Sequence, residues 1–329
     1  MRPMRIVTAV VTLAMAAVVA HAAEPAALVL ERSIALPNTG GRIDHMAVDL
    51  KRGRLFVAEL GNGSVDVVDI AGGGVLHRIA GLKEPQGVGY EPASDTLAVA
   101  NAGDGAVLLF RGEDYAAAGR VDLGDDADNV RVDRGRFVVG YGSGGLAATE
   151  AGGRVVGQGA LPAHPEGFQI DPTTRRAYVN VPDARLVAVV DLDSFKVAAT
   201  WRMGEAGGNF PMAFDTAHAA LAVVFRSPAR LLLFDTASGQ LTARIATCGD
   251  ADDVFFDAKR RRIYVSCGAG SVDVFQADER SLRLLARITT ASGARTALFV
   301  PELDRLFVAA PAGFLGIGKG AEILVFRPG

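Results

Sequence analysis

Cysteine, tryptophan and the short motifs that mark common enzyme classes are scarce or missing in this sequence. Its 329 residues include two cysteines and one tryptophan. There is no Cys-x-x-Cys-His sequence, which excludes covalently attached haem. There is also no Gly-x-Ser-x-Gly elbow, no His-Glu-x-x-His motif and no glycine-rich phosphate loop. The sequence therefore offers no nucleophile and base that match a known hydrolase pattern.

A strong excess of one charge is missing as well. The chain has 34 Lys and Arg against 37 Asp and Glu, and without Arg2 and Arg5 the balance of 32 against 37 gives a formal charge of −5. This excludes a global electrostatic footprint for nucleic acid or for an anionic membrane. The one basic cluster, residues 259–262, lies between two predicted strands, and we interpret it as a solvated hairpin tip.

No hydrophobic run reaches the roughly 18 residues that a membrane span needs. The longest N-terminal run, residues 6–20, has 15 residues and follows Arg2 and Arg5, with small residues near position 22. This pattern predicts a signal peptide over residues 1–23, and hence a periplasmic or secreted protein without a membrane span after cleavage. An uncleaved anchor stays open as the alternative. No cysteine near the cleavage point supports a lipoprotein.

What the sequence does contain is a repeat of three clear strands and a weaker, more polar fourth one. The residue that closes the first strand recurs at a mean spacing of about 42, which is typical of four-stranded propeller blades. These positions are Asp49, Glu91, Asp133, Asp171, Asp215, Asp257 and Pro301. The aspartates among them precede turns, and we expect them to cap those turns.

The two ends of the repeat complement each other. The last apolar segment, residues 323–326, is a third strand, whereas residues 28–36 resemble a fourth strand with no blade before it. Pairing these two segments closes a ring and covers an exposed edge. The sequence therefore predicts an all-β fold, a seven-bladed β-propeller of four-stranded antiparallel blades, in one domain over residues 24–329.

Several second strands carry a family resemblance. Residues 262–266 (Arg-Ile-Tyr-Val-Ser), 176–180 and 305–309 resemble the Tyr-Val-Thr-Asn strand of YVTN-type propeller repeats, and the whole chain is similar to YncE-like exported propellers. The resemblance implies the fold over nearly the full mature chain. It does not imply an activity, because propellers serve as enzymes, ligand binders and scaffolds.

Cys248 and Cys267 fall on the same face of the predicted disc, before the first strand and at the end of the second strand of the sixth blade. In an exported protein we expect them to form a disulfide that fastens the loop over residues 249–253. Two free thiols and a metal-binding pair are the alternatives. Trp201 lies on an outer strand, where we expect it to pack between blades.

Candidate site residues come from the loops that lead into the innermost strands, because these loops meet at the central channel. The expected ligand-binding residues are Asp44, His45, Gln86, Asn129, Glu166, Asn209, Asp252, Asp253 and Arg295. Arg295 could hold a carboxylate in bidentate fashion. A hard divalent cation, calcium or magnesium, would take its oxygen ligands from Asp44, Glu166 and Asp252, with Asp128 also nearby. His45 is either a general acid or base or a structural histidine.

These observations favour a binding module that takes a small polar molecule or a periplasmic protein at the channel mouth, as a monomer. A metal-dependent hydrolase or lyase is the alternative, because propeller lactonases and the virginiamycin B lyase group look similar in fold. A partner of a periplasmic redox enzyme is a weaker third option. The glycine-rich segment 311–320 is the least repeat-like part and is expected to be a mobile apolar flap over the mouth.

Overall fold

A computed structural model describes residues 26–204, 207–278, 281–313 and 320–329. The predicted signal peptide and most of the expected flap lie outside the described residues. The described chain consists of strands and three short 3-10 helices, η1 (Leu60–Asn62), η2 (Ala102–Asp104) and η3 (Pro301–Leu303). Among the described residues, no helix has the length and apolar character needed to cross a membrane.

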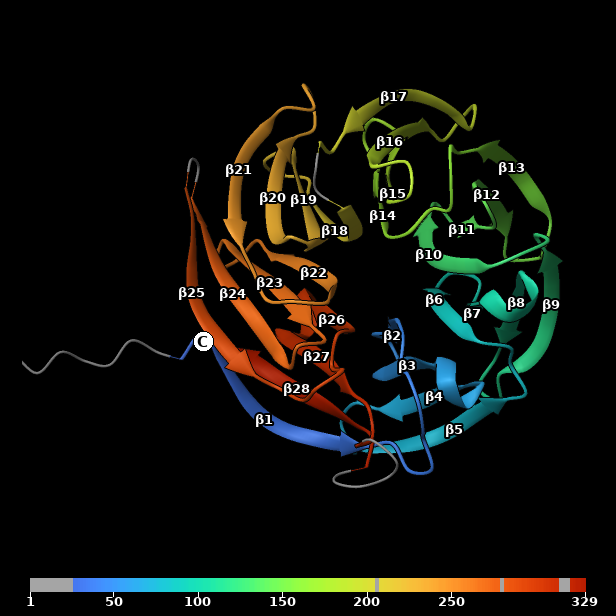
Figure 1. Cartoon of the computed structure of the whole chain (residues 1–329). Coiled ribbons are helices and arrows are strands. Elements are labelled where there is room, and N and C mark those ends of the chain that lie inside the picture. The colour runs from blue at the N-terminus through green and yellow to red at the C-terminus, as the bar shows by residue number, and fades with distance from the viewer. Residues whose placement is uncertain (1–25, 205–206, 279–280, 314–319) are drawn as a thin grey trace, which may run out of the picture.

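Twenty-eight strands form seven four-stranded antiparallel sheets arranged in a ring (Figure 1), which confirms the predicted propeller. Blades 1 to 3 are β2 (Met46–Asp49), β3 (Arg54–Glu59), β4 (Ser64–Asp69), β5 (Gly74–Ala80); β6 (Pro85–Glu91), β7 (Thr96–Asn101), β8 (Ala106–Arg111), β9 (Ala116–Asp122); and β10 (Ala127–Asp133), β11 (Arg136–Tyr141), β12 (Gly145–Glu150), β13 (Val155–Ala160).

Blades 4 to 7 continue around the ring. They are β14 (Phe168–Asp171), β15 (Arg176–Val181), β16 (Leu186–Asp191), β17 (Lys196–Arg202); β18 (Gly207–Asp215), β19 (Ala220–Ser227), β20 (Ala229–Asp235), β21 (Leu241–Ala246); β22 (Ala251–Asp257), β23 (Arg262–Cys267), β24 (Ser271–Asp278), β25 (Ser281–Thr289); and β26 (Ala297–Val300), β27 (Arg305–Ala310), β28 (Glu322–Pro328) with β1 (Leu28–Ala35). Six of the seven predicted positions end an innermost strand; Pro301 instead begins η3.

The core lies between neighbouring blades. Leu55 and Val57 of blade 1, for example, pack in one buried cluster with Phe307 of blade 7. Burial on both faces of the middle strands explains their unbroken apolar runs. Trp201 stacks on Tyr178 of its own blade at 5.3 Å and on Phe234 of the next blade at 6.1 Å, measured between ring centroids. Its predicted role between blades is confirmed.

The ring closes where β1 pairs antiparallel with β28, as predicted. Two arginines of the basic cluster hold this junction. Arg262 Nη1 donates to the carbonyl oxygens of Ala27 (3.1 Å) and Gly329 (2.9 Å), and Arg260 also donates to Gly329. The interpretation of residues 259–262 as a solvated tip is therefore wrong for these two side chains, because they bond the ends of the propeller rather than water.

The turns that follow the innermost strands lie on one face of the disc, which we call the hairpin face. The backbone N–H of Arg52 donates to Asp49 Oδ1 (3.1 Å), and Thr173 N–H donates to Asp171 Oδ1 (2.8 Å). Asp215 and Asp257 accept bonds of the same kind, which confirms turn capping for four of the aspartates. Asp133 differs, because it pairs with Arg175 of the next blade.

Candidate functional site

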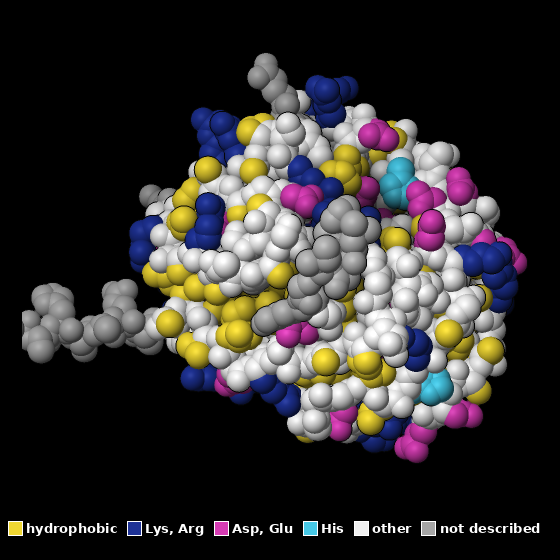
Figure 2. Space-filling model, turned by 60° about the horizontal axis from the view of Figure 1, so that its bottom comes forward, with side chains coloured by type: hydrophobic (Ala, Val, Ile, Leu, Met, Phe, Trp, Pro, Cys, Tyr) yellow, Lys and Arg dark blue, Asp and Glu magenta, His cyan; other side chains and the backbone are white. Residues whose placement is uncertain are grey.

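The innermost strands begin on the opposite face, which we call the mouth face, and a small cavity lies there. It has a volume of about 20 Å³, enough for a water molecule or an ion. Figure 2 shows acidic, basic and hydrophobic side chains spread over the visible surface, with a histidine beside acidic side chains near the upper right. The cavity is lined by His45, Asn129, Arg131, Glu166, Gly167, Phe210, Pro211, Met212, Asp252 and Asp253.

β-Bulges at the start of several innermost strands bring polar side chains into this space. The register shifts between Ala127 and Val130 in β10 and between Ala251 and Asp253 in β22. A bulge adds an unpaired residue and re-aims the neighbouring side chain. As a result Asp252 and Asp253 are both buried, although adjacent residues of a regular strand would point to opposite sides.

Asp44 is a fully buried carboxylate that lacks hydrogen bonds. Its side chain comes within 2.8 Å of Arg42 Nη2 and within 3.6 Å of His45 Nε2. Neither oxygen accepts a hydrogen bond of good geometry from the described part of the chain. Burial raises the pKa of Asp44, although the charges of His45 and Arg42 oppose the shift. A buried acceptor without a partner is costly, so this carboxylate is not placed there for stability.

Asp252 lies between two arginines. Arg226 Nη2 donates to its Oδ1 at 2.5 Å, and Arg42 Nη2 is 3.6 Å from its Oδ2, too far for a hydrogen bond. Oδ2 is buried and has no hydrogen-bond partner in the described residues. Burial and the neighbouring Asp44 raise the pKa of Asp252 to about 6. In contrast, Asp253 Oδ2 accepts a hydrogen bond from the backbone of Ala297 at 2.8 Å.

His45 sits between Asp44 and Asp253, with its Nδ1 3.8 Å from Asp253 Oδ1. Burial alone would lower its pKa, but the charge of Asp44 and the interaction with Asp253 outweigh it and raise the pKa to about 10. A charged imidazole donates hydrogen bonds from both nitrogens. In the structure as it stands, His45 is therefore suited to the role of an acid rather than of a base.

Arg131 is a residue that the sequence analysis missed. It lines the cavity from β10, donates from Nη1 to the carbonyl of Val130 at 2.8 Å, and lies 5.5 Å from the ring centroid of Phe168. Burial lowers the pKa of Arg131. The available signal was an arginine between two valines of an innermost strand, Val130 and Val132. Arg42, which contacts both Asp44 and Asp252, was missed too.

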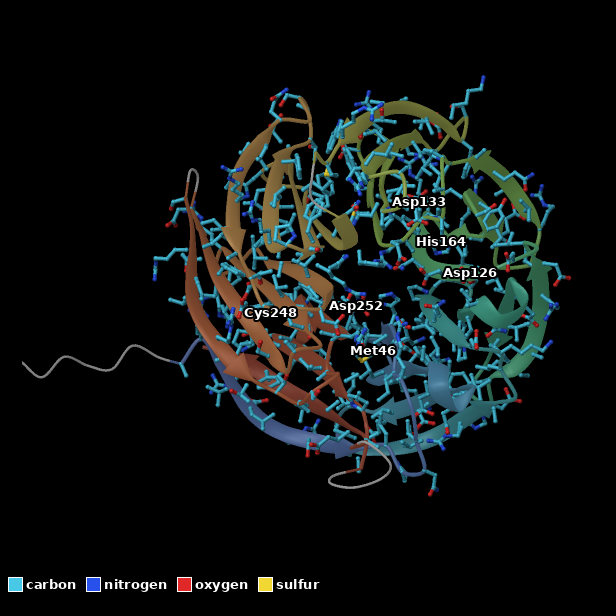
Figure 3. The ribbon with its side chains drawn as sticks, viewed as in Figure 1. Met46, Asp126, Asp133, His164, Cys248 and Asp252 are labelled. Carbon is cyan, nitrogen blue, oxygen red and sulfur yellow. A yellow bond between two sulfur atoms is a disulfide. The ribbon has the colours of Figure 1, made fainter. Side chains whose placement is uncertain are left out.

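A group of three side chains lies beside the cavity. Asp128, His164 and Glu166 each offer one ligand atom, and these atoms lie within 4.8 Å of one another. Figure 3 shows His164 and Asp126 close together near the channel. Burial and the charge of Asp128 raise the pKa of Glu166 to about 8. The structure thus groups Glu166 with Asp128 and His164, and Asp44 and Asp252 are not members of this group.

Gln86, Asn209 and Arg295, three of the expected ligand-binding residues, do not line the cavity. Asn209 is fully buried and donates to Asn180 Oδ1 (3.0 Å) and to the carbonyl of Leu186 (3.1 Å). Arg295 pairs with Asp250 at 2.8 Å. Gln86 is not among the residues that line the cavity. Its neighbour Gly87 allows close packing, because a Cβ there would lie 2.1 Å from the carbonyl oxygen of Asp128.

The predicted disulfide between Cys248 and Cys267 is present, with the two Cα atoms 5.9 Å apart. It ties the loop before β22 to the end of β23. The backbone N–H of Cys248 also donates to Asp273 Oδ2 at 2.9 Å. The start of β22, which carries Asp252 and Asp253, is therefore fixed by both a covalent bond and a hydrogen bond.

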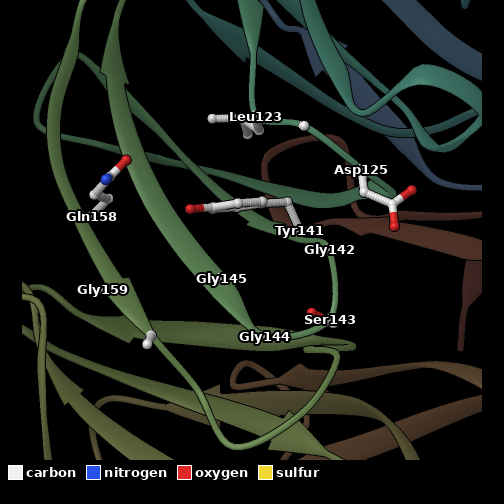
Figure 4. A pocket seen from close by; sticks show the side chains of 11 residues that line it. Leu123, Asp125, Tyr141, Gly142, Ser143, Gly144, Gly145, Gln158 and Gly159 are labelled. Atoms are coloured by element: carbon white, nitrogen blue, oxygen red, sulfur yellow. The ribbon is translucent and has the colours of Figure 1, made fainter.

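A larger pocket of about 460 Å³ lies in blade 3 and shares no lining residue with the cavity. Figure 4 shows the Tyr141 ring lying across this pocket beside a glycine-rich segment. A Cβ on Gly145 would fall 2.3 Å from that ring, so the glycine is what lets the tyrosine lie flat on the strand. The pocket gathers few charged groups, Asp125 being the exception, and we assign it no chemistry.

No protein-family model and no curated protein matches the sequence. Solved structures do match the fold. A chain of the hydrazine synthase of Kuenenia stuttgartiensis superposes with a TM-score of 0.74 at 15% identity, covering 89% of this chain and 98% of that one. A chain of a mitotic checkpoint complex superposes with a TM-score of 0.74 at 13% identity, covering 97% and 98%. At such identities the similarity shows the β-propeller fold and nothing finer.

Proposed function

We propose that this chain is an exported, YncE-like β-propeller that binds a small polar ligand at the mouth of its central channel. One observation carries the proposal: Asp44 and Asp252 together hold three buried carboxylate oxygens without a hydrogen bond in the described part of the chain. Buried polar groups in proteins are almost always hydrogen-bonded, and exceptions cluster at functional sites. A ligand that supplied the missing partners would remove this cost.

The chemistry of these atoms defines the kind of ligand. All three are acceptors, so the ligand has to bring hydrogen-bond donors or positive charge. The cavity of about 20 Å³ holds an ion or a small head group rather than a whole organic molecule. We therefore expect a hydrated divalent cation or the ammonium or guanidinium group of a larger molecule, whose remainder lies outside the mouth.

Melting curves test this directly. The purified exported protein is melted with calcium, magnesium and a panel of small ammonium and guanidinium compounds. At least one is expected to raise the melting temperature, since a ligand that binds only the folded state stabilises it. The shift should disappear in Asp44→Asn and Asp252→Asn and persist in Asp183→Asn, which removes an exposed carboxylate from a loop of blade 4. No shift with any compound contradicts a small-ligand site and redirects the search to periplasmic proteins.

A metal-dependent hydrolase or lyase is the second candidate. The observation that favours it is the geometry around Asp44, where a histidine that carries a proton lies 3.6 Å from a carboxylate expected to bind calcium or magnesium. In such an enzyme Asp44 and Asp252, two of the three expected ligands, would hold the cation and His45 would protonate the leaving group, while Glu166, the third, lies with Asp128 and His164. Hydrolysis or ring opening of lactones by wild-type protein, abolished in His45→Gln, supports it. Lactones left unchanged by protein that binds the cation exclude it.

A further inference from the structure

We propose that Asp128, His164 and Glu166 bind a divalent transition-metal ion, with zinc as the ion that suits this ligand set best. The inference goes beyond the small-ligand site, because Asp44 and Asp252, which carry that proposal, are not in the group. It also differs from a calcium or magnesium site, because it includes an imidazole nitrogen.

The local sequence places two of the ligands on one side of the chain. His164 and Glu166 flank Pro165 in the segment between β13 and β14, and a residue before proline is held in an extended conformation. In an extended segment, side chains two residues apart point the same way. The backbone N–H of Glu166 donates to the carbonyl of Asn180 at 2.9 Å, which fixes this segment against blade 4. Asp128 comes from the bulged start of β10 on the neighbouring blade.

The hydrogen bond of the His164 ring uses Nδ1, so Nε2 is available to bind a metal ion. His164 Nδ1 lies 2.7 Å from the carbonyl oxygen of Gly142, so it donates its proton there. Metal-binding histidines commonly donate the second ring N–H to a backbone carbonyl or a carboxylate, which orients the ring. The other nitrogen, Nε2, faces Asp128 Oδ2 at 3.8 Å, a separation beyond hydrogen-bond range.

The three candidate ligands already lie close to one another. The carboxylate of Asp128, which is only 4% exposed, is paired with His164, another member of the group, at 3.8 Å. Two ligand atoms on a tetrahedral zinc ion lie about 3.4 Å apart. The ligand atoms of the three side chains lie within 4.8 Å of one another, so the side chains have to close in by up to about 1.4 Å when the ion binds.

A fourth polar atom gives independent support. Asn129 follows Asp128, is 2% exposed, and lines the same cavity as Glu166. Its Oδ1 is buried and has no hydrogen-bond partner among the described residues. A buried amide oxygen without a partner, on the cavity that Glu166 also lines, is an acceptor that a bound ion or its water could engage.

Metal titration of the tag-free protein tests the proposal. We expect one zinc ion per chain, measured by competition with a chromophoric chelator, and one cobalt ion that gives a visible absorption band. His164→Gln and Glu166→Gln should each weaken zinc binding by more than about 100-fold, because even loss of an outer hydrogen-bond partner costs about 10–100-fold. The matched control is His218→Gln, since His218 lies on the hairpin face beside Asp215. It should leave the affinity unchanged.

Asp44→Asn separates this site from the small-ligand site. It should abolish the melting shift with the small ligand and change zinc affinity by less than about threefold, because its charge is not in the first coordination shell. Far-ultraviolet circular dichroism of each metal-free variant shows that it is folded. Stoichiometric zinc binding that survives both His164→Gln and Glu166→Gln overturns the proposal, and so does the absence of zinc binding in the wild-type protein.

Discussion

The two faces of the disc use the same acidic residue type in opposite ways. On the hairpin face, Asp257 is buried and fully engaged: it accepts bonds from Arg260 and from Tyr264, and Arg260 continues to Asp304 of the next blade. On the mouth face, five residues earlier along the same strand, Asp252 has an oxygen without a hydrogen bond in the described chain. One innermost strand therefore carries a structural carboxylate at one end and an unsatisfied one at the other.

The comparison shows that burial and charge alone do not identify a site. Asp49 and Asp44 are both buried and only five positions apart, and each forms an ion pair with an arginine. Asp49 also accepts hydrogen bonds from Arg52, whereas neither oxygen of Asp44 accepts one in the described chain. The two carboxylates differ in whether the surrounding residues supply enough hydrogen-bond donors. Groups left short of partners lower stability and tend to persist where function requires them.

The largest change in stability is expected when a hydrogen-bond donor is removed from the hairpin face. Arg260→Ala leaves Asp257 and Asp304 without their shared partner, and breaking such a buried pair should lower the free energy of unfolding by about 3 kcal/mol. Urea denaturation measures it. Arg261→Ala in the same turn is the control, because the described structure gives that side chain no ion pair; an equal loss in both variants would contradict the structural role of the pair.

The pH dependence of stability should have opposite signs on the two faces. Asp252 has a pKa of about 6 in the folded chain against 3.8 normally, so the unfolded chain loses its proton first. Raising the pH from about 4 to 6 therefore costs stability, by roughly 3 kcal/mol at 1.36 kcal/mol per pKa unit. The pairing with Arg260 lowers the pKa of Asp304, whose contribution is instead lost as the pH falls below about 4.

Urea denaturation at pH 3.5–7 in the presence of a chelator separates these two effects. Asp252→Asn should make the decline between pH 4 and 6 shallower without removing it, because Glu166 and Asp44 also have raised pKa values, and Asp304→Asn should flatten the loss at low pH. If both substitutions change the same limb of the profile in the same direction, the two faces do not differ electrostatically.

On the mouth face, a substitution is expected to raise the free energy of unfolding, by less than Arg260→Ala lowers it. Asp44→Asn removes a buried charge whose ionised form is disfavoured, and should raise the free energy of unfolding at pH 7 by about 1 kcal/mol while ligand binding is lost. Chemical denaturation of the ligand-free protein provides the measurement. Destabilisation of the size seen in Arg260→Ala would mean that Asp44 is a structural carboxylate after all.

The smallest effect is expected at the surface. Arg154 and Glu150 form an exposed pair at 2.5 Å across the turn between β12 and β13. Exposed pairs contribute little because water and salt screen them. Arg154→Ala should change the free energy of unfolding by less than about 0.5 kcal/mol, again by urea denaturation. A larger change would show that short distance alone, without burial, stabilises this fold.

The fold could be predicted because the strand pattern of one blade recurs seven times in the sequence. The spacing of residues such as Asp49, Asp171 and Asp257 fixes the blades, and the unpaired strands at the two ends predict ring closure. The disulfide followed from the placement of Cys248 and Cys267 in one blade. Each of these inferences needs only local patterns and their repetition.

The partners inside the channel could not be predicted in the same way. Asp252 meets Arg226 of the preceding blade and Arg42 from the start of the domain, and the bulge in β22 decides which way it points. Asn209 donates to Asn180, although its own Oδ1 has no hydrogen-bond partner in the described chain, and Arg295 pairs with Asp250; the sequence did not indicate these partners. His164 had a detectable signal, because His-Pro-Glu forces its two polar side chains onto one side, but it has no counterpart in the other repeats.

The junction between β1 and β28 has a consequence for the time course of folding. Among the described strands, β1 is the first in sequence and β28 the last, so blade 7 cannot be completed until residues 322–328 have been synthesised. Contacts this distant in sequence form late and slowly. Six blades can assemble before the ring locks, and until then the outer edge of blade 7 lacks its covering strand. The ring is thus kept open by its own topology until both strands of this junction are present.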